Sequence, residues 1–136
     1  MKYKLLLIED DEIFTFLLKK AMQKTGMPSA TGVFINGLEA LEYLKKEYCL
    51  EDNFVLFLDL NMPVMNGWQF LETLHHVAQP KNCMVFILTS SNYQKDLHKL
   101  EENPFVLATV SKPITTYIME GLKEKITLKL KEHTMK

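Results

Sequence analysis

The sequence predicts an α/β domain built on a doubly wound parallel sheet. Short apolar runs of strand length alternate with amphipathic stretches of helical length, and this alternation occurs five times. The runs are apolar almost throughout, which is expected of strands that are covered on both faces, as in parallel sheets. With 136 residues, 47% of them hydrophobic, the chain can bury a substantial core as one domain.

The predicted strands differ in how apolar they are. Four are nearly continuous apolar runs, at residues 5–8, 54–58, 84–88 and 105–110, the last of which is interrupted by Ala108 and Thr109. The fifth, at residues 30–35, alternates more between apolar and polar side chains. Because alternation suits a strand with less complete cover, we expect residues 30–35 at an edge of the sheet.

The first two predicted helices have clear ends. The first ends at Gly26 and Pro28, and its predicted inward face consists of Ile13, Phe16, Leu17, Ala21 and Met22. The second opens at Asn36, an N-cap followed by a capping-box glutamate at Glu39. Its predicted inward side chains are Leu38, Leu41 and Leu44.

Three further helices follow from apolar side chains at helical spacing. The third covers residues 68–77, with Leu71, Leu74 and Val77 aligned. The fourth covers roughly residues 93–102 and is the least apolar, with Leu97 and Leu100 as its main apolar residues. The last is the clearest, because four apolar residues recur at four-residue steps: Ile118, Leu122, Ile126 and Leu130.

Charge and cysteine usage exclude several classes of protein. The formal net charge is -1 and the sequence pI is about 6.4, so no basic field is available to bind a nucleic-acid backbone. Cys49 and Cys83 are far apart and form no CxxC motif, which favours reduced, packed thiols. The apolar run at residues 5–8 is too short for a signal peptide or a membrane span. We therefore expect a cytoplasmic protein that binds neither nucleic acid nor membrane.

Polar residues follow the predicted strands where each strand ends. The ends of parallel strands meet at one edge of a doubly wound sheet, and ligands bind there. The residues at these ends are Glu9, Asp10 and Asp11 after the first strand, Asp59 after the third, Thr89, Ser90 and Ser91 after the fourth, and Ser111, Lys112 and Pro113 after the fifth. Converging carboxylates repel one another unless a cation enters, and hard oxygen ligands suit Mg²⁺.

The same residues suit phosphoryl transfer. A lysine supplies a compact positive charge, and a threonine supplies a hydroxyl donor, for phosphoryl oxygens that the metal leaves open. Phosphoryl transfer depends mainly on positioning and on neutralisation of charge. In this interpretation Asp59 is the nucleophile and becomes an aspartyl phosphate.

These residues resemble the receiver domains of bacterial two-component response regulators, of the stand-alone, chemotaxis-regulator-like type. The segments that carry the resemblance are LLLIEDDE, FLDLNMPVMNGWQFL, ILTSS and VSKPI, which together extend over nearly the whole chain. The resemblance implies a flavodoxin-like fold with the strand order 2-1-3-4-5. It also implies that Mg²⁺ is the cofactor.

The resemblance assigns a role to each site residue. Asp59 matches the phosphoacceptor, and Glu9 and Asp10 match the acidic pair. Asp10 is expected to bind Mg²⁺ directly, Glu9 through water and Asn61 through its backbone carbonyl, with Asp59 completing the metal ligands. Thr89 and Lys112 match the switch hydroxyl and the phosphate-contacting lysine, and Ser90 is small enough to leave access to the phosphoryl group. The resemblance also suggests a cis peptide bond between Lys112 and Pro113.

Other polar residues have simpler structural interpretations. Asp11 and Glu12 suit the N-terminus of a helix, where the helix dipole favours acids. The four histidines, His75, His76, His98 and His133, are expected at the surface. Gly67 is expected to supply unusual backbone dihedrals in a turn over residues 65–67, so that the third helix starts close to the active edge.

One position departs from the family pattern. Three residues before the lysine, many receivers carry a Tyr or Phe that turns inward on phosphorylation, whereas this chain has Thr109. A threonine cannot report phosphorylation by burying a large ring. We therefore consider Tyr93, Phe105 or Tyr117 as alternative sources of aromatic surface near the last two strands and helices.

The sequence predicts a receiver over residues 1–136 without an output domain. It is expected to take a phosphoryl group from a histidine kinase or phosphotransfer protein and to signal by contact with a further protein, as a monomer or weak dimer and not as an enzyme. Two alternatives remain: a pseudo-receiver that docks without phosphorylation, which Thr109 favours, and a phosphatase of the haloacid-dehalogenase type. The latter usually needs a second aspartate two residues after the first, where this chain has Asn61.

Overall fold

The structure is a computed structural model that describes residues 2–90 and 94–134, and for residues 94–97, 133 and 134 it describes the backbone alone. Strands and helices alternate five times, as predicted. In chain order the elements are β1 (Lys4–Ile8), α1 (Glu12–Lys24), β2 (Gly32–Phe34), α2 (Gly37–Glu47), β3 (Phe54–Asp59), α3 (Gly67–Leu74), β4 (Cys83–Thr89), α4 (Gln94–Glu102), β5 (Val106–Ser111) and α5 (Thr116–Thr134).

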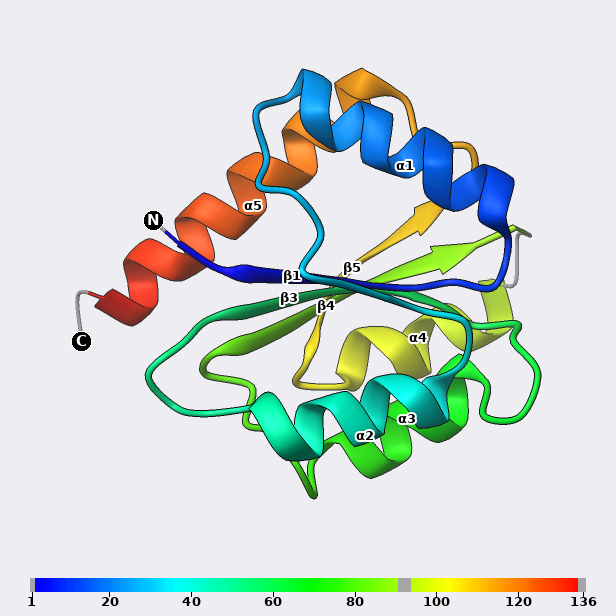
Figure 1. Cartoon of the computed structure of the whole chain (residues 1–136), viewed down its shortest axis with the longest axis vertical. Helices are drawn as coiled ribbons and strands as arrows, with labels where there is room; N and C mark the ends of the chain where they lie inside the picture. The colour runs from blue at the N-terminus through cyan, green and yellow to red at the C-terminus, as the bar shows by residue number, and fades with distance from the viewer. Residues whose placement is uncertain (1, 91–93, 135–136) are drawn as a thin grey trace.

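The strands form one parallel sheet in the order β2-β1-β3-β4-β5, which confirms the predicted order. Helices α1 and α5 cover one face of the sheet, and α2, α3 and α4 cover the other (Figure 1). Because all five strands run in the same direction, their carboxyl ends lie along one edge. The residues that the sequence places after β1, β3, β4 and β5 therefore come to the same side of the molecule.

Two hydrophobic cores hold the layers together, one on each face. Every residue of β3 and β4 is buried, so these central strands contribute to both cores. On the face of α1 and α5, the rings of Phe57 and Phe86 stack at a centroid distance of 5.3 Å. On the other face, Leu56 and Ile87 pack with Phe70 of α3. Burial on both sides explains why these strands read as continuous apolar runs.

Helix α1 is rotated relative to the predicted inward face. Ile13 is 74% exposed, and Phe16 and Leu17 are also exposed, whereas Ala21 and Met22 are buried as expected. The buried face also contains Leu18 and Thr15, and the Thr15 hydroxyl has no hydrogen-bond partner among the described residues. The prediction failed because apolar residues occupy more than one side of α1, so that spacing alone does not define its inward face.

The other helices follow the predictions more closely. In α2, Leu41 and Leu44 are buried, but Leu38 is exposed and Ala40 takes its place in the core. In α5 the buried residues are Met119, Leu122, Ile126 and Leu130, while Ile118 is half-buried. Helix α3 ends at Leu74 and not at residue 77, because the backbone N–H groups of His76 and Val77 bond to the carbonyls three residues back, those of Thr73 and Leu74, in a tight turn.

Two strands differ in detail from the prediction. The edge strand β2 spans three residues, Gly32–Phe34, instead of residues 30–35. Between β4 and β5 the register shifts, since Val106 pairs with Val85 whereas Ala108 pairs with Phe86. Leu107 is thus an extra residue in β5, as in a β-bulge. The bulge accounts for the irregular apolar pattern of this strand.

Two further features are the state of the cysteine thiols and the length and apolar character of the helices. Cys49 and Cys83 are both free, and burial raises the pKa of the Cys83 thiol to about 12. None of the helices in the described part of the chain has the length and apolar character to span a membrane.

Candidate functional site

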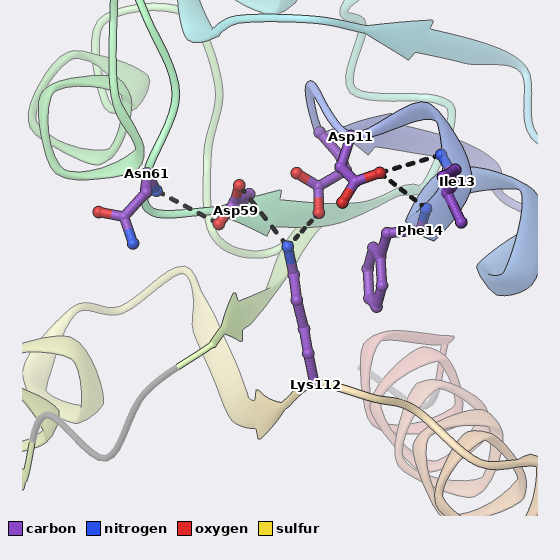
Figure 2. Close-up of polar contacts among 7 residues, drawn as sticks. Asp11, Ile13, Phe14, Asp59, Asn61 and Lys112 are labelled. Carbon is purple, nitrogen blue, oxygen red and sulfur yellow. Dashed lines mark hydrogen bonds and ion pairs between the residues drawn. The ribbon is translucent and has the colours of Figure 1, made fainter.

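The end of β1 brings one buried and two exposed acids to the carboxyl edge. Glu9 is 2% exposed, whereas Asp10 and Asp11 are exposed. Asp11 is the N-cap of α1, and its Oδ1 accepts hydrogen bonds from the backbone N–H groups of Ile13, at 3.0 Å, and Phe14, at 3.1 Å (Figure 2). This capping confirms the structural role expected of Asp11, and Glu12 lies in the first turn as predicted.

Asp59 is the last residue of β3 and is 4% exposed. Its Oδ1 accepts a hydrogen bond from the backbone N–H of Asn61 at 3.2 Å, and its Oδ2 lies 3.7 Å from the ammonium nitrogen of Lys112 (Figure 2). A carboxylate next to a core is costly unless it is paired. Here the pairing comes from the loop after β3 and from the segment after β5.

Lys112 connects three strand ends. Its backbone N–H bonds to the Thr89 carbonyl at 2.8 Å, and the peptide bond to Pro113 is cis, in agreement with the sequence-based suggestion. Its ammonium group donates a hydrogen bond to Glu9 Oε1 and also faces Asp59. Since its side chain is only 17% exposed, this cation is largely shielded from water.

Three carboxylates converge next to this lysine. One oxygen each of Glu9, Asp10 and Asp59 lie within 4.8 Å of one another. Burial raises the pKa of Glu9 to about 8, the neighbouring Asp59 carboxylate adds to the rise, and Lys112 opposes it. The second oxygen of Glu9, Oε2, is buried without a hydrogen-bond partner among the described residues.

These features fit a hard divalent cation. Mg²⁺ prefers carboxylate and carbonyl oxygens together with several waters, and a nearby divalent cation favours the ionised carboxylates. The orphaned Glu9 Oε2 is an acceptor that a metal-bound water could satisfy. For Asn61 the structure records a contact of the backbone N–H with Asp59, so the predicted ligand role of its carbonyl stays a prediction.

The hydroxyl-bearing residues come to the same edge. Thr89 ends β4, is buried, and pairs in register with Ser111 of β5. Ser90 follows directly and is exposed. Ser91 and Tyr93 lie outside the described residues. The structure therefore brings Glu9, Asp10, Asp59, Thr89 and Lys112 to one edge, while their chemical roles remain sequence-based predictions.

The loop between β3 and α3 corrects the interpretation of Gly67. The left-handed φ in this loop is at Val64, with a φ of 70°, and not at Gly67. Gly67 is required for a different reason: a Cβ at this position would lie 2.6 Å from the carbonyl oxygen of Asp59. The helix start beside it is fixed by a capping box between Asn66 and Gln69.

Phe14 belongs to the site but was missed in the sequence. Its ring lies against the ammonium group of Lys112, with 4.3 Å between the nitrogen and the ring centroid. An apolar residue in an amphipathic helix looks like a core residue. No sequence signal distinguishes a phenylalanine that only packs in the core from one that contacts the site lysine. The contact arises only because α1 and the end of β5 meet in the fold.

The strand order and the chemistry of the strand ends are those of a receiver domain of two-component signalling. A family model described as "Response regulator receiver domain" matches residues 5–122, and the chain belongs to this family. Receiver domains generally act as phosphoacceptors, bind Mg²⁺ at an acidic pocket and interact with histidine kinases or phosphotransfer proteins and with downstream targets.

Individual proteins show similarity over different spans. A two-component response regulator structure from Cytophaga hutchinsonii is 31% identical, with a TM-score of 0.80, and the match covers 91% of this chain and 96% of that one. A probable transcriptional regulator, ycf29, from Pyropia yezoensis is 36% identical over 99 residues, covering 71% of this chain and 40% of the relative. A protein-glutamate methylesterase/protein-glutamine glutaminase from Burkholderia thailandensis is 32% identical over 98 residues, covering 72% of this chain and 26% of the relative. This chain thus matches less than half the length of these two curated relatives.

Proposed function

We propose that this protein accepts a phosphoryl group on Asp59 from the phosphohistidine of a histidine kinase or phosphotransfer protein, in a Mg²⁺-dependent reaction. The observation that carries the proposal is the position of Asp59, buried at a strand end and flanked by Glu9, Asp10 and Lys112. The chain catalyses only its own phosphorylation and dephosphorylation, and it is otherwise not an enzyme.

The transfer exchanges one bond for another. A carboxylate oxygen of Asp59 attacks the phosphorus, the bond from phosphorus to the histidine nitrogen breaks, and the imidazole leaves with the electron pair. Lys112 faces Asp59, so its charge can neutralise a phosphoryl oxygen. Dephosphorylation ends the signal. Water attacks the phosphorus, the bond between the Asp59 oxygen and phosphorus breaks, and inorganic phosphate is released.

The metal ligands in this proposal are those expected from the sequence. Asp10 and Asp59 would hold Mg²⁺ directly, Asn61 would contribute its carbonyl, and Glu9 would act through water. When bound, the metal neutralises charge on the phosphoryl group and on the carboxylates. The convergence of the three acids and the orphaned Glu9 oxygen support this assignment.

Phosphorylation alters a protein surface, and the chain signals by contact with a further protein. We assign the output to the surface built from α4, β5 and α5, with Thr89 and Lys112 responding to the phosphoryl group. Thr109 is half-buried in β5, opposite Ile87. Of the aromatic alternatives, Phe105 is in the core, whereas Tyr117 is 86% exposed at the start of α5. Tyr117 is therefore our candidate for the aromatic surface.

The partners and setting in this proposal follow the sequence-based expectations. The protein is a cytoplasmic monomer or weak dimer that binds neither nucleic acid nor membrane. The pairing of Lys112 with Asp59 and Glu9 supports a phosphorylated receiver over a pseudo-receiver. The receiver family match over residues 5–122 weighs against the haloacid-dehalogenase alternative.

Incubation with acetyl phosphate and Mg²⁺, followed by intact mass, tests the proposal. We expect a gain of one phosphoryl group that is lost in Asp59→Asn and in the presence of a chelator. A protein that gains no mass with acetyl phosphate or any other small phosphodonor would contradict the proposal and favour a docking module. Steady turnover of a soluble phosphate ester would instead favour the phosphatase alternative.

A further inference from the structure

The contact between Phe14 and Lys112 has no place in the reaction described above. Phe14 is the third residue of α1, and its backbone N–H is bound by the Asp11 cap. Its half-buried ring packs against the core between α1, α5 and the sheet. Figure 2 shows the ring on the flank of the Lys112 side chain, which extends from the end of β5 toward Asp59. The ammonium nitrogen is 4.3 Å from the ring centroid.

The distance and the shielding make this contact an attractive one. A cation within about 6 Å of an aromatic centroid is attracted by the ring's electrons, and the attraction grows as water is excluded. The Lys112 side chain is only 17% exposed. In the described part of the chain the ammonium group also pairs with the carboxylates of Glu9 and Asp59, whose charges are neutralised or altered when a metal or a phosphoryl group arrives. The attraction by the ring does not depend on those charges.

We propose that Phe14 is a positioning residue for Lys112, and that its ring face keeps the lysine ammonium beside Asp59 while the charge of the surrounding carboxylates changes. This inference rests on the proposed function. It assigns a role in phosphoryl transfer to a side chain that acts through the lysine and has no donor, acceptor or charge of its own.

A packing role alone explains the site less well. Phe14, Leu17, Pro113 and Ile114 line a cavity of about 260 Å³, so the ring is not enclosed on all sides. A leucine at position 14 would fill much of the same core space without an aromatic face. Phe14→Leu and replacement of Phe14 by 3,4,5-trifluorophenylalanine therefore separate the two roles, because the fluorinated ring keeps its shape and loses its attraction for a cation.

The first measurement is the rate of Asp59 phosphorylation by acetyl phosphate with saturating Mg²⁺. We expect Phe14→Leu and the trifluorinated ring each to slow it by roughly 3- to 10-fold. In a Lys112→Ala background the same Phe14→Leu change should have no further effect, because Phe14 acts through the lysine. Equal slowing in both backgrounds, or no slowing by the fluorinated ring, would overturn the positioning role.

The second measurement does not depend on phosphorylation. In NMR spectra, the ring current of Phe14 should shift the ε-methylene protons of Lys112 upfield, and Phe14→Leu should remove this shift. An unchanged ε-methylene resonance would refute the contact itself. Failure of the proposed function is distinguishable from either result, since it would appear as a wild-type protein that gains no phosphoryl group while the ring-current shift is present.

Discussion

Gly67 shows how the site depends on the absence of a side chain. At this position a Cβ would lie 2.6 Å from the Asp59 carbonyl oxygen and 2.8 Å from the Leu60 Cα, both of which are backbone atoms. The N–H of Gly67 bonds to the Leu60 carbonyl at 3.0 Å, so the loop returns directly to the end of β3. The start of α3 can therefore approach the candidate phosphoacceptor only with glycine at residue 67.

We expect Gly67→Ala to lower the free energy of unfolding by about 1–3 kcal/mol, the usual cost of forcing extra volume into a packed site. Urea unfolding followed by circular dichroism measures the change. Gly121→Ala is the matched control, because the added Cβ meets nothing within 4 Å apart from the adjoining residues and the backbone of its own helix, and the residue is exposed inside α5. The control should gain about 1 kcal/mol from helix propensity. A loss of similar size in both variants would contradict the close-approach explanation.

At the scale of elements, α1 illustrates what a sequence pattern leaves undecided. Apolar residues lie on its buried face and on its outer face, where Ile13, Phe16 and Leu17 are exposed. Hydrophobic spacing identified the helix and its end but not its rotation about its own axis. The rotation is set by how α1 packs against the sheet and α5, and this packing also places Phe14 next to Lys112.

The start of α1 allows a test that separates capping from metal binding. Asp11→Ala should lower the free energy of unfolding by about 1 kcal/mol, because two backbone N–H groups lose their acceptor. The affinity for Mg²⁺, measured by titration of tryptophan fluorescence, should stay within twofold of the wild type. Asp10→Asn is the contrasting variant, with weakened Mg²⁺ binding and an intact cap. A Mg²⁺ affinity that falls as far in Asp11→Ala as in Asp10→Asn would show Asp11 to be a ligand.

At the scale of the whole molecule, the sequence was sufficient to predict the layers of the fold and the edge of the sheet that carries the site. Continuous apolar strands predicted a covered parallel sheet, and acids, hydroxyls and a lysine at successive strand ends predicted where they would meet. Three features were not predictable: the shift that makes Leu107 an extra residue in β5, the ring of Phe14 against Lys112 and the left-handed φ at Val64. The first two result from elements distant in sequence meeting in space, which local periodicity does not encode. The third lies in a loop, where no periodic pattern is present to be interpreted.

The distance in sequence between the acids makes Mg²⁺ a probe of the whole fold. Glu9 and Asp10 follow β1 and Asp59 ends β3, so an unfolded chain does not hold the three carboxylates together. A ligand that binds only the native state stabilises it by about 2.7 kcal/mol at a concentration of 100 times its Kd. We therefore expect Mg²⁺ at that concentration to raise the free energy of unfolding by this amount relative to protein in chelator. Urea unfolding followed through Trp68, the one tryptophan of the chain, measures the gain.

Two controls separate specific binding from screening of charge. A monovalent salt at matched ionic strength weakens the repulsion among the carboxylates but cannot coordinate all three, so it should give only a small part of the gain. At the same Mg²⁺ concentration, Asp10→Asn should lose most of it, because one of the converging carboxylates is gone. If the monovalent salt matched the effect of Mg²⁺, or if Asp10→Asn kept the full gain in free energy of unfolding, Mg²⁺ would act only by weakening the repulsion among the carboxylates. The acidic cluster would then not be a metal site.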